Sequence, residues 1–114
     1  MLSKEHKITQ KKDFENIFRK GVSFKEGFLI LKTSRNSSQT SRFAFIASQK
    51  VSKKATIRNK IRRQLKELIR SRVSEIKKGT DNVFIALSGL ENKNSDEIKN
   101  TLVDLLKKAK LIKN

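Results

Sequence analysis

Apolar residues between positions 55 and 76 recur with the period of an α-helix. Steps of three, four or one residue place them on a single helix face, which is the pattern of a helix packed on a core. The residues are Ile57, Ile61, Leu65, Leu68, Ile69, Val73 and Ile76. We predict a helix that begins near Ala55 or Thr56 and ends at the turn 77–82.

The opposite face of this predicted helix is strongly basic. Asn59, Arg63, Lys66 and Arg70 follow one another at spacings of four, three and four, and Lys60 and Arg62 flank them. Glu67 and Glu75 are the acidic residues within this segment. Because so many like charges repel one another, such a face is typical of a surface that binds a polyanion.

Two further helices are predicted from the same periodicity. The first runs from about residue 10 to 20, with Thr9 as N-cap and Phe14, Ile17 and Phe18 on one face. The last begins after Ser95, its predicted N-cap, and its core face consists of Ile98, Leu102, Leu105, Leu106 and Ala109.

The remaining apolar segments predict strands. Residues 22–34 favour extended structure, and residues 42–48 and 82–88 favour two more strands. A strand, the basic helix and another strand predict a βαβ unit with a parallel pair. If residues 22–25 form a short strand, the order is αβββαβα. We predict an α+β fold with a four-stranded sheet packed by helices, one domain over 1–114, and a flexible segment 1–8.

Alternation along residues 42–48 separates two faces of that strand. Phe43, Phe45 and Ala47 point one way and are predicted to be core, whereas Ala44, Ile46 and Ser48 point the other way. The run 28–31 is apolar on both faces, so one of its faces can be buried while the other lines a groove.

Composition strengthens the polyanion hypothesis. Lys and Arg number 28 against 11 Asp and Glu, which gives a net charge of +17 and a pI near 10.6 for 114 residues. The chain has no Cys, no apolar run long enough for a membrane span, and no apolar secretory segment after Met1. We therefore expect a cytoplasmic protein with a nucleic-acid partner and no membrane association.

The sequence offers little for protein-borne catalysis. His6 is the single histidine, no Cys/His set suits zinc, the four glycines stand singly, and the carboxylates are scattered over helix surfaces and loops. A nuclease built from protein groups needs converging carboxylates or a paired acid and base. The residues thus predict specific nucleic-acid binding without a catalytic site in the protein.

Residues 55–66, A-T-I-R-N-K-I-R-R-Q-L-K, resemble the R-N-x-x-K/R-R signature helix of the protein component of bacterial ribonuclease P. The D-F-x-x-I-F-x-x-G pattern at 13–21 is similar to the first helix of that family. The strand R-F-A-F-I-A-S-Q-K before the signature, the strand at Val83 and the final amphipathic helix also match the family arrangement. The resemblance covers nearly the whole chain from Ile8.

This resemblance implies both a fold and a function. The family has a fold like ribosomal S5 domain 2, with a left-handed βαβ crossover. Its protein is a small subunit of a ribonucleoprotein that removes the 5′ leader of precursor tRNA. The resemblance implies that the catalytic RNA holds the Mg²⁺ ions, and that the protein binds this RNA and the leader and lowers the magnesium requirement. The expected partners are ribonuclease P RNA and precursor tRNA, with no protein partner.

Site residues follow from the resemblance position by position. Contacts with the catalytic RNA are expected from the basic face: Arg58, Asn59, Lys60, Arg62, Arg63, Lys66 and Arg70. The cleft for the single-stranded leader is expected to comprise Phe14, Phe18, Leu29, Leu31, Ala44, Ile46 and Ser48. Leu31 stands where many relatives have Tyr, so no stacking ring is expected there. Residue type alone favours ordinary core packing for the two phenylalanines.

Two other classes of function share the size and charge. A ribosomal or ribosome-assembly protein would bind rRNA, but that hypothesis leaves the combination of D-F-x-x-I-F and R-N-K-I-R-R unexplained. A DNA-binding architectural protein is the second alternative. The sequence shows neither a compact helix-turn-helix nor a dimer interface, which sequence-specific DNA binding would favour.

Overall fold

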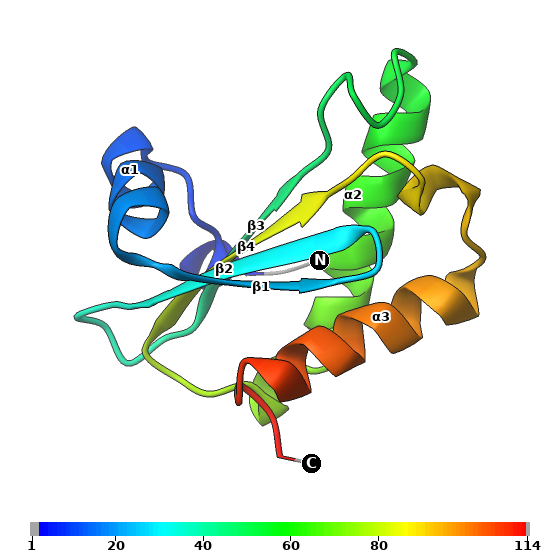
Figure 1. The fold of residues 1–114 in the computed structure, drawn as a ribbon. Coiled ribbons are helices and arrows are strands. Elements are labelled where there is room, and N and C mark those ends of the chain that lie inside the picture. The colour runs from blue at the N-terminus through cyan, green and yellow to red at the C-terminus, as the bar shows by residue number, and fades with distance from the viewer. Residues whose placement is uncertain (1–2, 114) are drawn as a thin grey trace.

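The computed structural model describes residues 3–113. Its helices and strands follow the order αβββαβα, which confirms the α+β prediction (Figure 1). They are α1 (Lys11–Lys20), β1 (Val22–Glu26), β2 (Leu29–Arg35), β3 (Arg42–Ile46), α2 (Ala55–Arg70), β4 (Thr80–Ala86) and α3 (Ser95–Lys108). Short 3₁₀ helices occupy Lys4–His6, Val73–Glu75 and Leu90–Asn92.

The four strands form one sheet in the order β1-β2-β4-β3. β1 and β2 form an antiparallel hairpin, and Gly27 in its turn has a φ of 55°, a left-handed conformation that glycine adopts without steric cost. β2 and β4 are antiparallel, whereas β3 and β4 are parallel. The parallel pair on either side of the basic helix is therefore confirmed.

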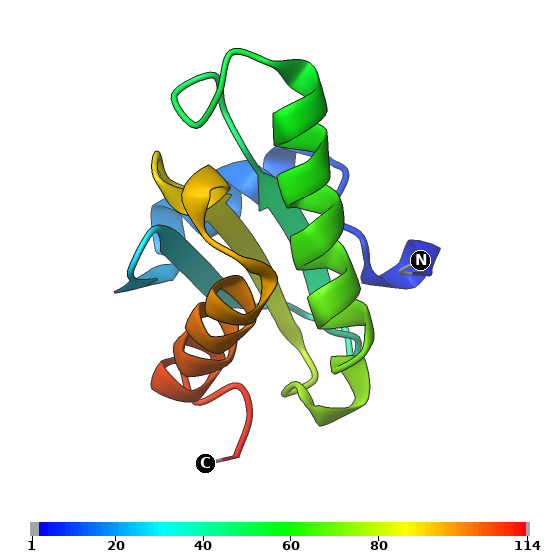
Figure 2. The ribbon, with the colours of Figure 1, turned by 90° about the vertical axis from the view of Figure 1, so that its right-hand side faces the viewer.

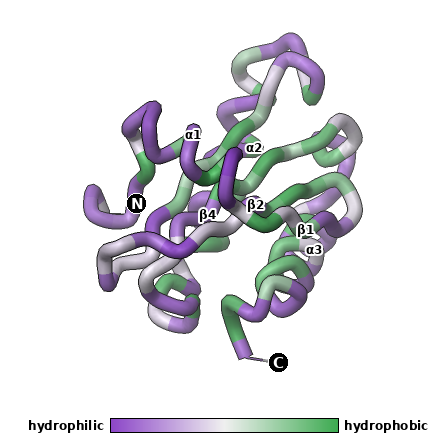
Figure 3. Tube along the Cα trace, turned by 60° about the vertical axis from the view of Figure 1, so that its left-hand side comes forward, coloured by the Kyte–Doolittle hydropathy of each residue, from purple (hydrophilic) through white to green (hydrophobic). Residues whose placement is uncertain are grey.

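Helices cover the two faces of the sheet unequally. α2 and α3 lie on one face and α1 lies on the other, as the two ribbon views show (Figures 1 and 2). The trace of α3 alternates between hydrophobic and hydrophilic residues, as expected for a helix with one face on a core (Figure 3). The molecule thus has a two-helix layer, a sheet and a single-helix layer.

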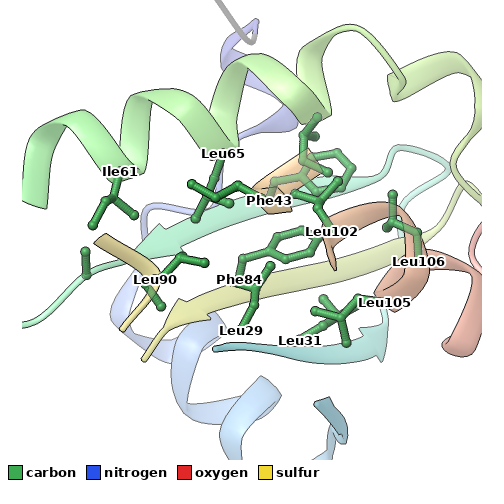
Figure 4. Close-up of a cluster of buried hydrophobic side chains, with 14 of the residues drawn as sticks. Leu29, Leu31, Phe43, Ile61, Leu65, Phe84, Leu90, Leu102, Leu105 and Leu106 are labelled. Carbon is green, nitrogen blue, oxygen red and sulfur yellow. The ribbon is translucent and has the colours of Figure 1, made fainter. Parts of the chain in front are cut away.

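The main core lies between the sheet and the α2/α3 layer. Ile61 and Leu65 of α2 point toward Phe43 and Phe84 of the sheet, and residues of α3 close the cluster (Figure 4). The rings of Phe45 and Phe84 stack with centroids 5.8 Å apart. A smaller cluster on the other face contains buried Ile8, Ile17 and Val83.

Several predicted boundaries differ from the structure. α2 ends at Arg70, and Val73 lies in a 3₁₀ turn after it, so the apolar stripe outlasts the helix. The N-cap of α3 is Asn94 and not Ser95, because Asn94 and Glu97 form a reciprocal capping box. α1 begins after Gln10, one residue beyond the predicted cap Thr9.

The start of the chain is attached to β3. Residues 1 and 2 of the segment predicted to be flexible lie outside the described residues. The amide of Ile8 donates to the Phe43 carbonyl at 3.0 Å, and the Ile8 side chain is buried. His6 donates from Nδ1 to the Ser41 carbonyl at 2.7 Å. Residues 6–8 therefore lie along the outer edge of β3, where they help to shape the site described next.

Candidate nucleic-acid interface

A groove of about 520 Å³ lies between the N-terminal segment, α1, β3 and the basic face of α2. β3 is an edge strand of the sheet, and residues 6–8 lie beside its start, where Lys7 bridges to Phe43. Its lining residues are Lys7, Ile8, Thr9, Phe14, Phe43, Ala44, Phe45, Asn59, Arg62, Arg63 and Lys66. Apolar groups from α1 and the sheet thus face cationic groups from α2 across one open channel.

The apolar side of the groove contains Phe14, which is half-buried over the smaller core cluster beside Ala44. Phe18 lies one turn further along α1 and is 43% exposed. The ammonium of Lys32 lies 5.4 Å from the centroid of the Phe18 ring, within the range of a cation–π contact. Phe14 therefore has a packing role and an accessible face, whereas Phe18 is chiefly a surface ring.

The cationic side contains two side chains available for a ligand. Arg63 is exposed and Lys66 is half-buried, and within residues 3–113 neither takes part in an ion pair. An Arg guanidinium can bind two phosphate oxygens at once, while a Lys ammonium acts as a mobile point charge. This pair is suited to a phosphodiester backbone.

Arg58 and Arg62 serve the protein's own backbone as well. Arg58 donates to the carbonyls of Ser52 and Lys53, each at 3.0 Å. Arg62 donates to the carbonyl of Ala47 at 3.0 Å and also to the side chain of Asn59. These bonds hold the connector between β3 and α2 against the helix, a role that the sequence prediction did not include.

Lys60 and Arg70 lie outside the groove. Lys60 lines a separate depression with residues 90–95 and Ile98. Arg70 donates from Nε to Glu67 at 2.9 Å, and this hydrogen bond lowers the pKa of the Glu67 carboxyl below its usual value. The predicted RNA face therefore divides into groove residues, connector anchors and outlying residues.

The predicted leader cleft is corrected at two positions. Leu29 and Leu31 are completely buried in the main core, on the face of the sheet covered by α2 and α3. They cannot contact a ligand in the groove because the sheet itself lies between. Ile46 is half-buried in the smaller cluster, and Ser48 is exposed, with its Oγ accepting from the Lys50 amide. Phe14 and Ala44 are the predicted cleft residues that line the groove.

Sequence reasoning missed the contribution of the N-terminal segment. Lys7, Ile8 and Thr9 line the groove because Ile8 is bonded to β3. The signal available in the sequence was Ile8 itself, a single apolar residue within a polar run. Its partner on β3 is 35 residues away, so local pattern could not identify the pairing.

A second missed feature is an ionic clamp beside the groove. Arg42 donates to both carboxylate oxygens of Asp81, at 2.7 and 2.6 Å, and to Asp13 of α1 at 3.3 Å. Asn36 adds a hydrogen bond to Asp81 at 2.8 Å. The hydrogen bonds that Arg42 donates to Asp81 raise the pKa of Arg42 above its usual value. The clamp joins the first turn of α1 to the sheet and so helps to position Phe14.

Among residues 3–113, no His, Cys, Asp or Glu side chain lines the groove. Within residues 3–113, no three His, Cys, Asp or Glu side chains are placed to hold a metal ion together. No helix of that range has the length and apolar character needed to cross a bilayer. The groove offers an aromatic ring and cations, which suit binding of an extended anionic chain.

Comparison with known proteins decides the family. Residues 2–110 match the family model for Ribonuclease P. The chain belongs to the ribonuclease P protein family. A ribonuclease P protein component from Clostridium botulinum (strain Langeland) is 37% identical over 107 residues, which cover 93% of this chain and 96% of the relative. One from Syntrophomonas wolfei is 32% identical over 111 residues, which cover 97% of this chain and 92% of the relative.

Solved structures of ribonuclease P proteins share the fold. The Staphylococcus aureus RNase P protein superposes with a TM-score of 0.87 at 29% identity, covering 94% of this chain and 97% of its own. The Thermotoga maritima RNase P protein gives a TM-score of 0.81 at 28% identity. The superposition covers 90% of this chain and 96% of the Thermotoga protein. These likenesses confirm the predicted family and its mixed α+β architecture.

Proposed function

We propose that this chain is the RNA-binding subunit of ribonuclease P, which acts with a catalytic RNA to remove the 5′ leader of precursor tRNA. In this proposal one phosphodiester bond is hydrolysed at the mature 5′ end. The RNA subunit holds the Mg²⁺ ions, and the protein contributes binding energy and lowers the magnesium requirement. Membership of the family supports the coarse assignment.

The observation that carries the proposal is the composition of the groove. It places the Phe14 ring and the cations Arg63 and Lys66 around one groove beside the edge strand β3. A single strand has unpaired bases that stack on rings and phosphates that pair with cations, so both sides of the groove find partners without strong sequence preference. We propose that the leader lies in this groove against Phe14, and that the basic face of α2, including Arg63 and Lys66, contacts the catalytic RNA beside the leader.

The ring of Phe14 provides a direct test of leader binding. Base–aromatic stacking contributes about 1–3 kcal/mol per base, so Phe14→Ala is expected to weaken holoenzyme binding of leader-bearing precursor about 10-fold. Affinity for mature tRNA is expected to stay within about two-fold, since mature tRNA lacks the leader. Equilibrium binding of the two RNAs to the reconstituted holoenzyme measures the difference.

Phe28→Ala is the matched control for this experiment. Phe28 is 39% exposed and does not line the groove, and its ring contacts Lys93. The control removes an equal side chain and is expected to leave both affinities unchanged. Equal losses for precursor and mature tRNA with Phe14→Ala would indicate that Phe14 only packs the smaller core cluster.

A further inference from the structure

Positive charge extends well beyond α2. Six of the 28 lysines and arginines lie in that helix. Four others surround a separate pocket of about 430 Å³ where β1 begins and β2 ends. They come from the end of α1, the end of β2, the turn before β4 and the residue that follows the C-cap of α3. We call this site the distal basic pocket, and its four cations are Lys20, Arg35, Lys77 and Lys110.

The distal basic pocket is separate from the groove on β3. No described residue lines both. The groove lies beside β3 and the pocket beside the start of β1, and these two strands are the opposite edges of the sheet. All four cations are exposed, and in the described range 3–113 none of them forms an ion pair. No Asp or Glu side chain among the described residues lines the pocket. Its charge is therefore available to an external anion.

Backbone hydrogen bonds hold the segments of this pocket together. The amide of Lys77 donates to the carbonyl of Leu111 at 2.8 Å, which ties the turn before β4 to the end of the chain. The amide of Asn36 donates to Gly79 at 2.9 Å and ties the end of β2 to the same turn. Three of the four cations are thus carried on segments that are bonded to one another.

Lys110 adopts a backbone conformation that disfavours lysine. Its φ is 58°, and it is the one non-glycine residue among residues 3–113 with a positive φ. Amides of Lys110 and Leu111 donate to Lys107 and Leu106, the pattern of a Schellman motif, in which glycine is the usual residue at this position. A lysine here is strained, and its charge offers a reason for its presence.

We infer that the distal basic pocket binds phosphates of the catalytic RNA, as a second contact distant from α2. This inference rests on the proposed function. Four cations that converge from separate segments suit neighbouring phosphates of a folded RNA, and the Arg35 guanidinium can bind one of them through two oxygens. Binding along both edges of the sheet would let the protein bridge two parts of the RNA.

Lys77→Ala with Lys110→Ala tests the pocket through the salt dependence of binding. Each lost phosphate contact lowers the slope of log affinity against log salt by about 1, so the double variant should lower it by about 2 and weaken binding roughly 10–100-fold. The measurement is a salt titration of the full chain with ribonuclease P RNA. Lys12→Ala with Lys99→Ala removes the same charge from exposed helix positions and is expected to change the slope little.

Lys110→Gly separates binding from folding. Relief of the left-handed strain is expected to raise Tm by about 2–5 °C, while the salt slope falls by about 1. A slope unchanged in both variants would overturn the inference. A lower Tm would show instead that the charge serves the end of α3.

If the proposed function is wrong, the binding measurements are expected to differ from those that would overturn only the distal basic pocket. Wild-type chain that binds an rRNA fragment as tightly as ribonuclease P RNA would argue against that function. The slope comparison repeated on the rRNA would then still decide whether the pocket binds phosphates.

Discussion

Replacement of Arg63 and Lys66 by alanine is expected to weaken binding to the catalytic RNA about 100-fold without loss of the fold. Both side chains line the groove, and neither forms an ion pair within residues 3–113. A hydrogen bond to a charged group contributes about 1.5–3 kcal/mol, so two lost contacts amount to roughly 3 kcal/mol or more. Equilibrium binding to ribonuclease P RNA at fixed salt measures the loss.

Two controls make this result specific. The variant Lys12→Ala with Lys99→Ala removes the same net charge elsewhere and should bind with nearly wild-type affinity. Circular dichroism should show unchanged helix content in the Arg63/Lys66 variant, because the core face of α2 is formed by Ile61, Leu65 and Ile69. An equal affinity loss in the two double variants would mean that net charge, and not this groove, determines binding.

Arg42→Met is expected to lower stability more than any surface charge substitution. The change leaves the carboxylate of Asp81, whose side chain is 8% exposed, without its main partner, and it releases Asp13 of α1. Removal of one member of a buried ion pair costs about 3–5 kcal/mol, and since Arg42 is partly exposed we expect the lower end of this range. The corresponding fall in Tm is roughly 10 °C.

Arg70→Met is the matched control for the clamp. Its ion pair with Glu67 is about half exposed on both sides, so water screens it and its loss is expected to change stability little. Thermal unfolding of both variants under the same conditions gives the comparison. If Arg42→Met lowered Tm no more than Arg70→Met, the clamp would not be a principal link between α1 and the sheet.

The sequence predicted best what depends on local periodicity. The core stripe of α2, the apolar face of α3 and the parallel strand pair around the basic helix all follow from spacing along the chain, and the structure confirms each of them. The family signature was equally local, since residues 55–66 are contiguous. The hand of the βαβ crossover stays a prediction.

Positions that depend on long-range pairing could not be assigned from the sequence. Residues 28–31 are apolar on both faces, so alternation did not show which side faces the groove. Pairing of Leu31 with Phe84 in the sheet, beneath α2 and α3, determines that Leu29 and Leu31 are core. The Arg42–Asp81 pair spans 39 residues and leaves no periodic signal.

The sequence also did not show that some basic residues bind the protein's own backbone. A basic stripe predicts a cationic surface but does not show which guanidiniums are already engaged. Arg58 and Arg62 donate to backbone carbonyls of the connector before α2, whereas Arg63 projects into the groove. Residues that look equivalent on a helical wheel therefore differ in their availability to RNA.

Cleavage of precursor tRNA at low magnesium tests the central proposal most directly. The assay compares the protein alone, a bacterial ribonuclease P RNA alone, and the two combined. We expect cleavage at the mature 5′ end in the mixture only, because the RNA supplies the chemistry and the protein supplies binding. Cleavage by the protein alone would contradict the proposal. So would a protein that fails to stimulate cleavage by the RNA but binds other structured RNA tightly.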